Sequence, residues 1–303
     1  MIKRTIYIST PCALKMKDNQ LVVQYNHIKG QENKADKTVP IEDIGFLILE
    51  HDQITLTHRM IAALLENNVA LITSNTKMLP TGLILNLNGN TLQGERFRWQ
   101  IEASEPLKKQ LWSQIVKQKI INQSFLLECE NKEIKKMFNL ADSVLSGDES
   151  NNEAQAAVYY WQHIFAPSWN FKRDREGTPP NNLLNYGYTI LRAIMARSLV
   201  GSGLLPTLGI FHRNRYNAYA LADDMMEPYR PFVDKIVLDI IHSTSNIDPL
   251  SIELKSKLLQ IPTMDVKLEK ETSPLMIATQ RTAASLVRCF EGERRKLLLP
   301  SMI

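Results

Sequence analysis

One stretch of the sequence, residues 209–234, gathers side chains that could bind a metal ion. His212 stands directly before two arginines, and Asp223 and Glu227 are four residues apart, a spacing that puts both on one face of a helix. Histidine and carboxylate ligands suit Mg²⁺ or Mn²⁺. The acids could instead pair with neighbouring arginines, and a lone histidine is more often a hydrogen-bonded structural residue. The stretch is therefore either part of a metal site or a polar helix surface.

A metal shared by His212 and Glu227 requires the chain to turn between them. On one continuous helix their separation of fifteen residues would span about 22 Å, too far for two ligands of one ion. Asn217 is expected to cap a short helix, and Pro228 to interrupt it directly after Glu227. Arg230 could then contact a phosphate or hold the carboxylate.

A third ligand has to come from elsewhere, and Glu153 is the candidate. It lies near the N-terminus of an expected helix at residues 151–165, which Asn151 or Asn152 should cap. A carboxylate in that position also interacts favourably with the helix dipole, so a purely structural role stays open.

Other kinds of chemistry lack their signatures. The sequence has no G-x-x-x-x-G-K-S/T, no G-x-G-x-x-G after a strand, no H-E-x-x-H and no G-x-S-x-G. Its three cysteines are far apart and form no zinc or redox pair, which suits a reducing compartment. No apolar run is long enough for a signal peptide or a membrane span. We therefore expect a soluble cytoplasmic protein.

Basic residues form tight clusters near the acidic candidates in the sequence. The net charge is +4 and the isoelectric point about 8.8, which permits a nucleic-acid partner without requiring one. Solvated surface is the ordinary interpretation of any one cluster. The nearness of these clusters to the acids favours phosphate binding. The clusters are Lys172, Arg173 and Arg175; Arg213 and Arg215; and Arg294, Arg295 and Lys296.

The elements that position these residues indicate an α+β fold of two domains. Residues 1–88 are expected to be mostly β with one helix at 57–68, which begins at Thr57. Residues 89–303 are expected to be helical. The expected strands are 4–9, 20–25, 38–50, 53–57, 69–74 and 78–85, and the expected helices of the second domain are 104–128, 132–147, 151–165, 180–203, 231–243 and 274–299.

Four segments of the helical part carry a resemblance to a known family. They read NNEAQAAVYYW, NNLLNYGYTILRAIM, GLLPTLGIFH and YALADDMMEPYRPFVD. In this order, after a β domain, they resemble CRISPR-associated protein 1, most closely the form from type II systems. The resemblance implies that Glu153, His212 and Glu227 bind the divalent metal. Many members outside type II have Asp at the third position, and Asp223 is a further candidate to support the ligands.

The resemblance also implies an activity and partners. The expected reaction is transesterification, in which a protospacer 3′-hydroxyl attacks a phosphodiester at the leader–repeat boundary, together with metal-dependent DNA endonuclease activity. The β domains would form a homodimer, and one dimer of CRISPR-associated protein 2 would bridge two such dimers, with other type II adaptation proteins as further partners. The residues expected to contact the phosphates of double-stranded DNA are Lys172, Arg173, Arg213, Arg215 and Arg230.

Two alternatives compete with this hypothesis. A DNA-binding scaffold subunit without catalysis would keep the basic clusters and leave the acids without a role. A helical metallohydrolase acting on small phosphates would use the same ligands but would leave the β domain without a role.

Overall fold

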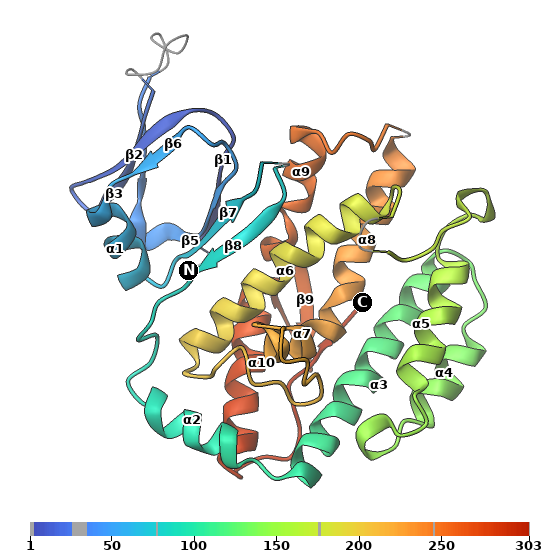
Figure 1. Ribbon diagram of the computed structural model, residues 1–303. Helices are drawn as coiled ribbons and strands as arrows, with labels where there is room; N and C mark the ends of the chain where they lie inside the picture. Colours follow the sequence, from blue (N-terminus) through green and yellow to red (C-terminus); the bar gives the residue numbers. More distant parts are fainter. Residues whose placement is uncertain (1–2, 26–34, 77, 175–176, 245, 303) are drawn as a thin grey trace. The chain divides into compact units, whose positions relative to one another are not determined.

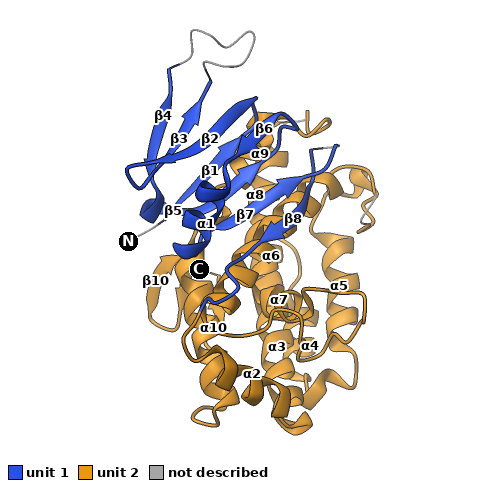
Figure 2. Ribbon diagram, turned by 60° about the vertical axis from the view of Figure 1, so that its left-hand side comes forward, with its two compact units in different colours: residues 1–89 blue, residues 90–303 orange. Residues whose placement is uncertain are grey.

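The computed structural model describes residues 3–25, 35–76, 78–174, 177–244 and 246–302. Strands dominate the first part of the chain and helices the second, so the predicted α+β fold class is confirmed (Figure 1). The chain forms two compact units, Met1–Gly89 and Asn90–Ile303 (Figure 2).

Two four-stranded sheets build the first unit. In one sheet β1, β5 and β7 are parallel, and β8 pairs antiparallel with β7. In the other sheet β3 pairs antiparallel with β2 and β4, and β6 is parallel to β2. The bounds are β1 Arg4–Ile8, β2 Cys12–Lys17, β3 Gln20–Gln24, β4 Lys37–Pro40, β5 Ile44–Leu49, β6 Ile54–Leu56, β7 Ala70–Ser74 and β8 Pro80–Ile84.

Both sheets and α1 (His58–Glu66) contribute to one apolar core. Leu14, Ile44 and Leu64 are fully buried in it. The strand β5 is buried along its whole length, as the unbroken apolar run IGFLIL predicts for a central parallel strand. Thr57 caps α1 by accepting a hydrogen bond from the backbone of Met60, which confirms the predicted start of this helix.

Two details of the β domain differ from the sequence prediction. The segment expected as one strand at 38–50 contains β4, a 3₁₀ turn (η1, Ile41–Asp43) and β5, and the two strands belong to different sheets. The strand β2 is not predicted because it has only six residues and two of the last three are exposed lysines, after the buried Cys12 and Leu14.

Nine α-helices are described in the second unit, with four 3₁₀ turns and three short strands. The α-helices are α2 Gln93–Glu102, α3 Glu105–Cys129, α4 Lys135–Asp142, α5 Asn152–His163, α6 Asn181–Gly201, α7 Ala220–Met226, α8 Arg230–Ser243, α9 Ile252–Leu258 and α10 Leu275–Phe290. The 3₁₀ turns are η2 Ser146–Asp148, η3 Pro167–Trp169, η4 Glu227–Tyr229 and η5 Ile261–Thr263. The strands β9 Asp265–Leu268, β10 Glu271–Pro274 and β11 Pro300–Ser301 form an antiparallel sheet in the order β10-β9-β11.

The sequence prediction missed the shorter elements here. The helices α2 and α9 and the strands β9, β10 and β11 are short and lack a long apolar period. The helix expected at 274–299 ends earlier, at Phe290, where Gly292 adopts a positive φ of 86°. The long helices α3 and α6 are close to their predicted bounds, because their apolar pattern covers many turns.

The helix α6 is buried on most sides and packs against α7, α8 and α10. Its contact with α8 is close, since a Cβ atom added to Gly187 would lie 2.5 Å from Cγ1 of Val233. A glycine is therefore needed for these two helices to pack at this distance, and both carry side chains of the candidate site.

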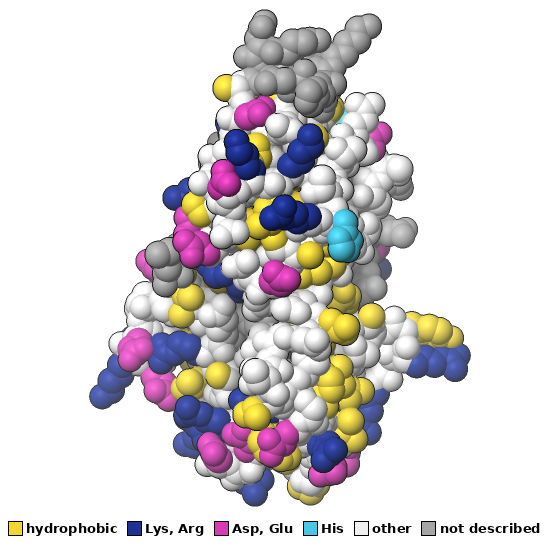
Figure 3. Space-filling model, turned by 90° about the vertical axis from the view of Figure 1, so that its left-hand side faces the viewer, with side chains coloured by type: hydrophobic (Ala, Val, Ile, Leu, Met, Phe, Trp, Pro, Cys, Tyr) yellow, Lys and Arg dark blue, Asp and Glu magenta, His cyan; other side chains and the backbone are white. Residues whose placement is uncertain are grey.

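The surface drawn in Figure 3 mixes acidic, basic and apolar side chains, with no large patch of one charge. This fits the small net charge of +4. Among the helices that the structure describes, none is long and apolar enough to cross a bilayer.

Candidate metal centre

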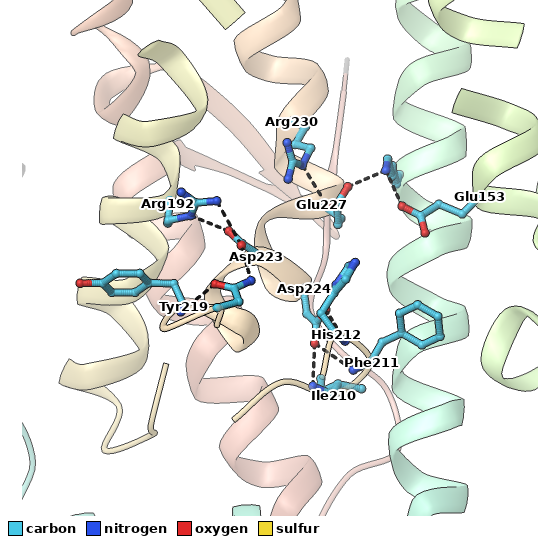
Figure 4. A network of polar contacts seen from close by, with 12 residues as sticks. Glu153, Arg192, Ile210, Phe211, His212, Tyr219, Asp223, Asp224, Glu227 and Arg230 are labelled. Atoms are coloured by element: carbon cyan, nitrogen blue, oxygen red, sulfur yellow. Dashed lines mark hydrogen bonds and ion pairs between the residues drawn. The ribbon is translucent and has the colours of Figure 1, made fainter. Parts of the chain in front are cut away.

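His212 lies in the loop between α6 and α7, and a buried carboxylate holds it there. Oδ1 of Asp224 on α7 lies 2.5 Å from Nδ1 of His212, while Oδ2 accepts from the backbone N–H groups of Ile210 (2.6 Å) and Phe211 (2.9 Å) (Figure 4). A Cβ atom added to Gly209 would lie 2.4 Å from the carbonyl oxygen of His212, so only glycine fits this tight turn. The hydrogen bond to Asp224 raises the pKa of His212 against the opposing effect of burial.

Asp224 thus supports His212, a role that the sequence suggests for its neighbour Asp223. The carboxylate of Asp223 instead binds Arg192 and the side-chain amide of Asn217. Asn217 is not the N-cap residue of α7 as predicted: Tyr219 is, and the side chain of Asn217 accepts a hydrogen bond from its backbone N–H at 3.0 Å. A helix places consecutive residues about 100° apart, so spacing in the sequence alone could not decide between the two aspartates.

Glu227 lies where the chain breaks between α7 and α8, as Pro228 predicts. Its side chain is buried, and Oε1 accepts from Nε of Arg230 at 2.8 Å. Burial alone would raise the pKa of Glu227, but the charges of Arg230 and Lys119 outweigh it and lower the pKa to about 2. Glu227 is therefore an ionised carboxylate inside the protein.

Glu153 lies in the first turn of α5 and points toward α3. The cap of α5 differs from the prediction: Asp148 accepts the backbone N–H groups of Asn152 and Glu153, both at 2.9 Å, and the N-cap residue Asn151 contributes no side-chain bond. Oε1 of Glu153 lies 2.6 Å from Nζ of Lys119. The carboxylate therefore has a specific partner beyond the helix dipole.

Lys119 on α3 joins the two acids. Its ammonium group lies 2.6 Å from Glu153 and 2.5 Å from Oε2 of Glu227 (Figure 4 draws both contacts as dashed lines). Burial disfavours the charged form, but the two carboxylates outweigh this effect and raise the pKa of Lys119. One buried cation therefore pairs with two carboxylates from different elements, and Arg230 supplies a second positive charge at Glu227.

Two of the three residues expected as ligands, Glu153 and Glu227, meet at this lysine. Figure 4 shows the ring of His212 directed toward Glu227 and Glu153, and both carboxylates help to raise the pKa of His212. Within the described part of the chain, no three His, Cys, Asp or Glu side chains are close enough together to hold a metal as they stand. The ammonium group of Lys119 lies between the two carboxylates.

The donor set nevertheless fits a divalent cation. Oε2 of Glu227 is buried and lies 2.5 Å from the ammonium group of Lys119, so a cation already occupies the place beside this oxygen. Nδ1 of His212 is fixed by Asp224, which leaves Nε2 as the nitrogen that could bind a metal. Two carboxylates and an imidazole nitrogen suit Mg²⁺ or Mn²⁺.

The basic residues expected at the site occupy two places. Arg173 and Arg230 both stack on the ring of Tyr188, at 5.3 and 4.7 Å from its centroid. Arg213 and Arg215 belong to the exposed loop after His212, where Arg213 pairs with Glu105 and Arg215 stacks on Tyr216. Lys172 is exposed beside Arg173, and Arg175 lies outside the described residues.

Matches to known proteins extend over both units of the chain. The model of the family "CRISPR associated protein Cas1" matches residues 6–250. A relative from Neisseria meningitidis serogroup C (strain 8013), named CRISPR-associated endonuclease Cas1, is 33% identical over 306 residues, covering 100% of this chain and 97% of the relative. A Pyrobaculum aerophilum relative, named CRISPR-associated endonuclease Cas1 2, is 25% identical over 273 residues, covering 86% of this chain and 92% of the relative.

Solved structures share the fold at low sequence identity. A casposase bound to an integration product superposes with a TM-score of 0.80 at 18% identity, covering 98% of this chain and 92% of that one. A CAS1 protein from Thermotoga maritima superposes with a TM-score of 0.72 at 16% identity, covering 99% of this chain and 100% of that one. A chain of a Cas6-RT-Cas1–Cas2 complex gives 0.75 at 20% identity, covering 98% of this chain and 36% of that chain.

Proposed function

Because the chain belongs to the Cas1 family of CRISPR-associated proteins, we propose that it is a divalent-metal-dependent DNA endonuclease and integrase of CRISPR adaptation. It inserts protospacer DNA into the CRISPR array, as the 3′-hydroxyl of the protospacer attacks a phosphodiester at the leader–repeat boundary. The observation that carries this proposal is the convergence of Glu153 and Glu227 on one buried cation, with His212 directed toward them.

Glu153, His212 and Glu227 would hold the metal, Mg²⁺ or Mn²⁺, in place of the ammonium group of Lys119. The ion supplies electrophilic stabilisation of the charge that develops on the phosphate. Asp224 keeps the Nδ1 side of the imidazole occupied, so that the ring presents Nε2 to the site. No protein nucleophile is needed, because the attacking oxygen belongs to DNA.

The arginines and lysines near the site bind DNA phosphates. Arg230 fixes Glu227 through Nε and can donate its other N–H groups to a phosphate oxygen. The remaining phosphate contacts are assigned to Lys172, Arg173, Arg213 and Arg215. Such contacts position the DNA without reading its sequence and weaken as salt increases.

The proposed assembly is a homodimer formed through the first unit, two of which are bridged by one dimer of CRISPR-associated protein 2. The similarity to a chain of the Cas6-RT-Cas1–Cas2 complex supports this choice of partner. Assignment to the type II form, with further type II adaptation proteins as partners and action in the prokaryotic cytoplasm, rests on the resemblance described above.

One observation favours a second candidate, a DNA-binding scaffold without catalysis. Lys119 and Arg230 already pair with the two carboxylates, so the acids could serve only the fold. A small-phosphate hydrolase, by contrast, gains no support, because the family match begins at residue 6 and so includes the β domain.

Strand transfer into a supercoiled plasmid carrying the repeat separates the first two candidates. With the small partner protein and Mg²⁺ or Mn²⁺, we expect integration that EDTA abolishes. Glu153→Gln should reduce it by more than about 100-fold, since a metal ligand is lost. Glu149→Gln, which changes an exposed acid paired with Lys109, is the control and should retain activity. Full activity of the Glu153 variant would leave the scaffold as the better description.

A further inference from the structure

Three arginines line a pocket of about 250 Å³ beside the candidate metal centre. The other described residues of its wall are neutral, and no carboxylate is among them: Asn185, Tyr188, Thr189 and Met226. The arginines are Arg173, Arg192 and Arg230. A smaller pocket of about 120 Å³, lined by Lys119 and Glu227 among others, shares Arg173, Tyr188 and Arg230 with it. The arginine pocket is therefore the neighbour of the site where the metal would bind.

The wall of this pocket is rigidly held. The hydroxyl of Tyr188 donates a hydrogen bond of 2.5 Å to Asp234, which is buried in the packing of α5, α6 and α8. Both Arg173 and Arg230 then stack on the fixed ring of Tyr188. Because the ring already contacts two guanidinium groups, it is not available as a stacking surface for a base.

Carboxylates orient two of the arginines and leave N–H groups for a ligand. Asp223 accepts from Nε and Nη2 of Arg192 at 2.6 and 3.1 Å, and Glu227 accepts from Nε of Arg230. A guanidinium has five N–H donors, and neither Nη1 of Arg192 nor the terminal nitrogens of Arg230 hydrogen-bond to a described residue. These donors have the geometry that suits phosphate oxygens.

We propose that the pocket of Arg173, Arg192 and Arg230 binds a backbone phosphate of the DNA strand, next to the phosphate that reacts at Glu227. The inference rests on the proposed function, because it takes DNA as the ligand. The N–H groups that Asp223 and Glu227 leave open on Arg192 and Arg230 supply the hydrogen bonds to the phosphate oxygens. Arg192, which the sequence patterns do not single out, is the residue specific to this pocket.

Arg192→Gln tests the contact, with Arg281→Gln as a matched control. Both arginines lie on helices, pair with one carboxylate and have about one third of the side chain exposed, 33% and 34%. Binding of a labelled duplex with single-stranded 3′ ends is followed by fluorescence anisotropy in EDTA, so that catalysis plays no part. We expect Arg192→Gln to weaken binding roughly fivefold to tenfold at about 100 mM NaCl and to lower the salt slope by about one. Arg281→Gln should match the wild type.

A methylphosphonate scan identifies the phosphate. Single neutral linkages are placed at each position near the 3′ end. At the bound position the neutral linkage should weaken binding to the wild type several-fold but leave binding to Arg192→Gln unchanged, because the contact is already lost. If no position behaves in this way, the DNA assignment of the pocket is wrong even where strand transfer by the wild type succeeds. If the wild type does not bind DNA at all, the proposed function fails as well.

Free phosphate offers the same oxygen acceptors as a DNA phosphate. A thermal-shift measurement with inorganic phosphate distinguishes the two ligands. Stabilisation of the wild type but not of Arg192→Gln by millimolar inorganic phosphate, without any coupled position in the scan, would assign the pocket to a small anion and overturn the proposal. Loss of Arg192 leaves Asp223 unpaired. If Arg192→Gln does not fold, the double variant Arg192→Gln with Asp223→Asn, which removes both partners, takes its place. It should show the same decrease in the salt dependence of DNA binding.

Discussion

A lysine holds together the two acids that are proposed to bind a metal. Lys119 is buried on α3, and its partners, Glu153 and Glu227, come from α5 and from the turn after α7. A buried charge is stable only while its partner is present, because an unpaired ion inside a protein loses its hydration without compensation. The three charges therefore depend on one another unless another cation replaces the ammonium group.

Lys119→Met is expected to make the site depend on the metal. Without metal, loss of the buried cation should lower the free energy of unfolding by about 3–5 kcal/mol, because Glu153 loses its counter-ion and Glu227 keeps only Arg230. Mn²⁺ should restore more stability to the variant than to the wild type, since no ammonium group has to be displaced. Urea unfolding with EDTA and with Mn²⁺, together with calorimetric titration of Mn²⁺, measures both effects.

Lys117→Met is the control for this prediction. Lys117 lies two residues away on the same helix and forms an exposed ion pair with Asp142. Its loss should change the free energy of unfolding by about 0–1 kcal/mol and should leave Mn²⁺ binding unaltered. Equal stabilisation of the wild type and of the Lys119 variant by Mn²⁺ would show that the metal does not bind at the position of the lysine ammonium group.

For individual residues, the sequence predicted the acids of the candidate site better than the basic residues with which they pair. Lys119 continues the row of Leu107, Leu111 and Ile115 at a spacing of four, so a charge on the buried face of α3 was a usable signal. Nothing comparable marks Arg192. Its pairing with Asp223 joins residues 31 positions apart and depends on how α6 packs against α7.

A single buried carboxyl group ties three helices together. Asp234 on α8 accepts hydrogen bonds from Tyr160 on α5 (2.9 Å) and Tyr188 on α6 (2.5 Å). Burial raises the pKa of Asp234 from 3.8 to about 6, although the two hydroxyls and Arg230 act in the opposite direction. The helices that carry Glu153, Arg192 and Arg230 thus meet at a group that titrates in mild acid.

The raised pKa predicts how stability changes with pH. The folded state holds the proton of Asp234 more tightly than the unfolded chain, so this contribution is full below about pH 4 and is lost as the pH rises through about 6. The difference between the two pKa values corresponds to about 3 kcal/mol in the free energy of unfolding. Asp234→Asn should remove this part of the pH dependence and gain stability relative to the wild type near neutral pH, as measured by urea unfolding across the interval.

Asp239→Asn on the same helix is the comparison for that experiment. The side chain of Asp239 is mostly exposed and pairs weakly with Lys235. Its replacement should leave the pH profile parallel to that of the wild type. A parallel profile for Asp234→Asn as well would mean that the buried carboxyl does not titrate in this range.

Single residues of the sequence predicted where some helices begin or end, but they failed for others. Pro228 predicts the break after α7 because proline lacks the N–H group that a continuing helix needs. Ser104 predicts the start of α3, and its hydroxyl does accept from the backbone of Leu107. The cap of α5 escaped prediction, because Asp148 lies in the preceding 3₁₀ turn and reaches forward to the helix.

For the molecule as a whole, the first unit is proposed to form the homodimer. The strand β8 is an edge of its sheet, and Leu79 and Ile84 each expose 39% of their surface there. Exposed strand edges with apolar side chains favour pairing with another chain. The strand-like runs of the sequence predict a β domain. They do not predict which sheet edge pairs with another chain, because the edge strands are known only once the strand order is known.

Ile84→Asp is expected to weaken the dimer. A carboxylate at this edge would lose hydration on pairing, and the measured mass should fall toward the 34.6 kDa of one chain. Light scattering after size-exclusion chromatography gives the mass. Ile252→Asp, at an exposed isoleucine of the second unit, should leave the mass unchanged. A dimer that survives Ile84→Asp would place the interface elsewhere.

The lysine between Glu153 and Glu227 also bears on how the protein tolerates metal scarcity. Since an internal ammonium group pairs with the acids when no ion is bound, metal loss need not unfold the chain or leave its acids repelling each other. Inactivation by a chelator should then be reversed within the mixing time on adding Mn²⁺, without a refolding step. Supply of the ion would thus switch the proposed activity off and on repeatedly while the same molecules stay folded.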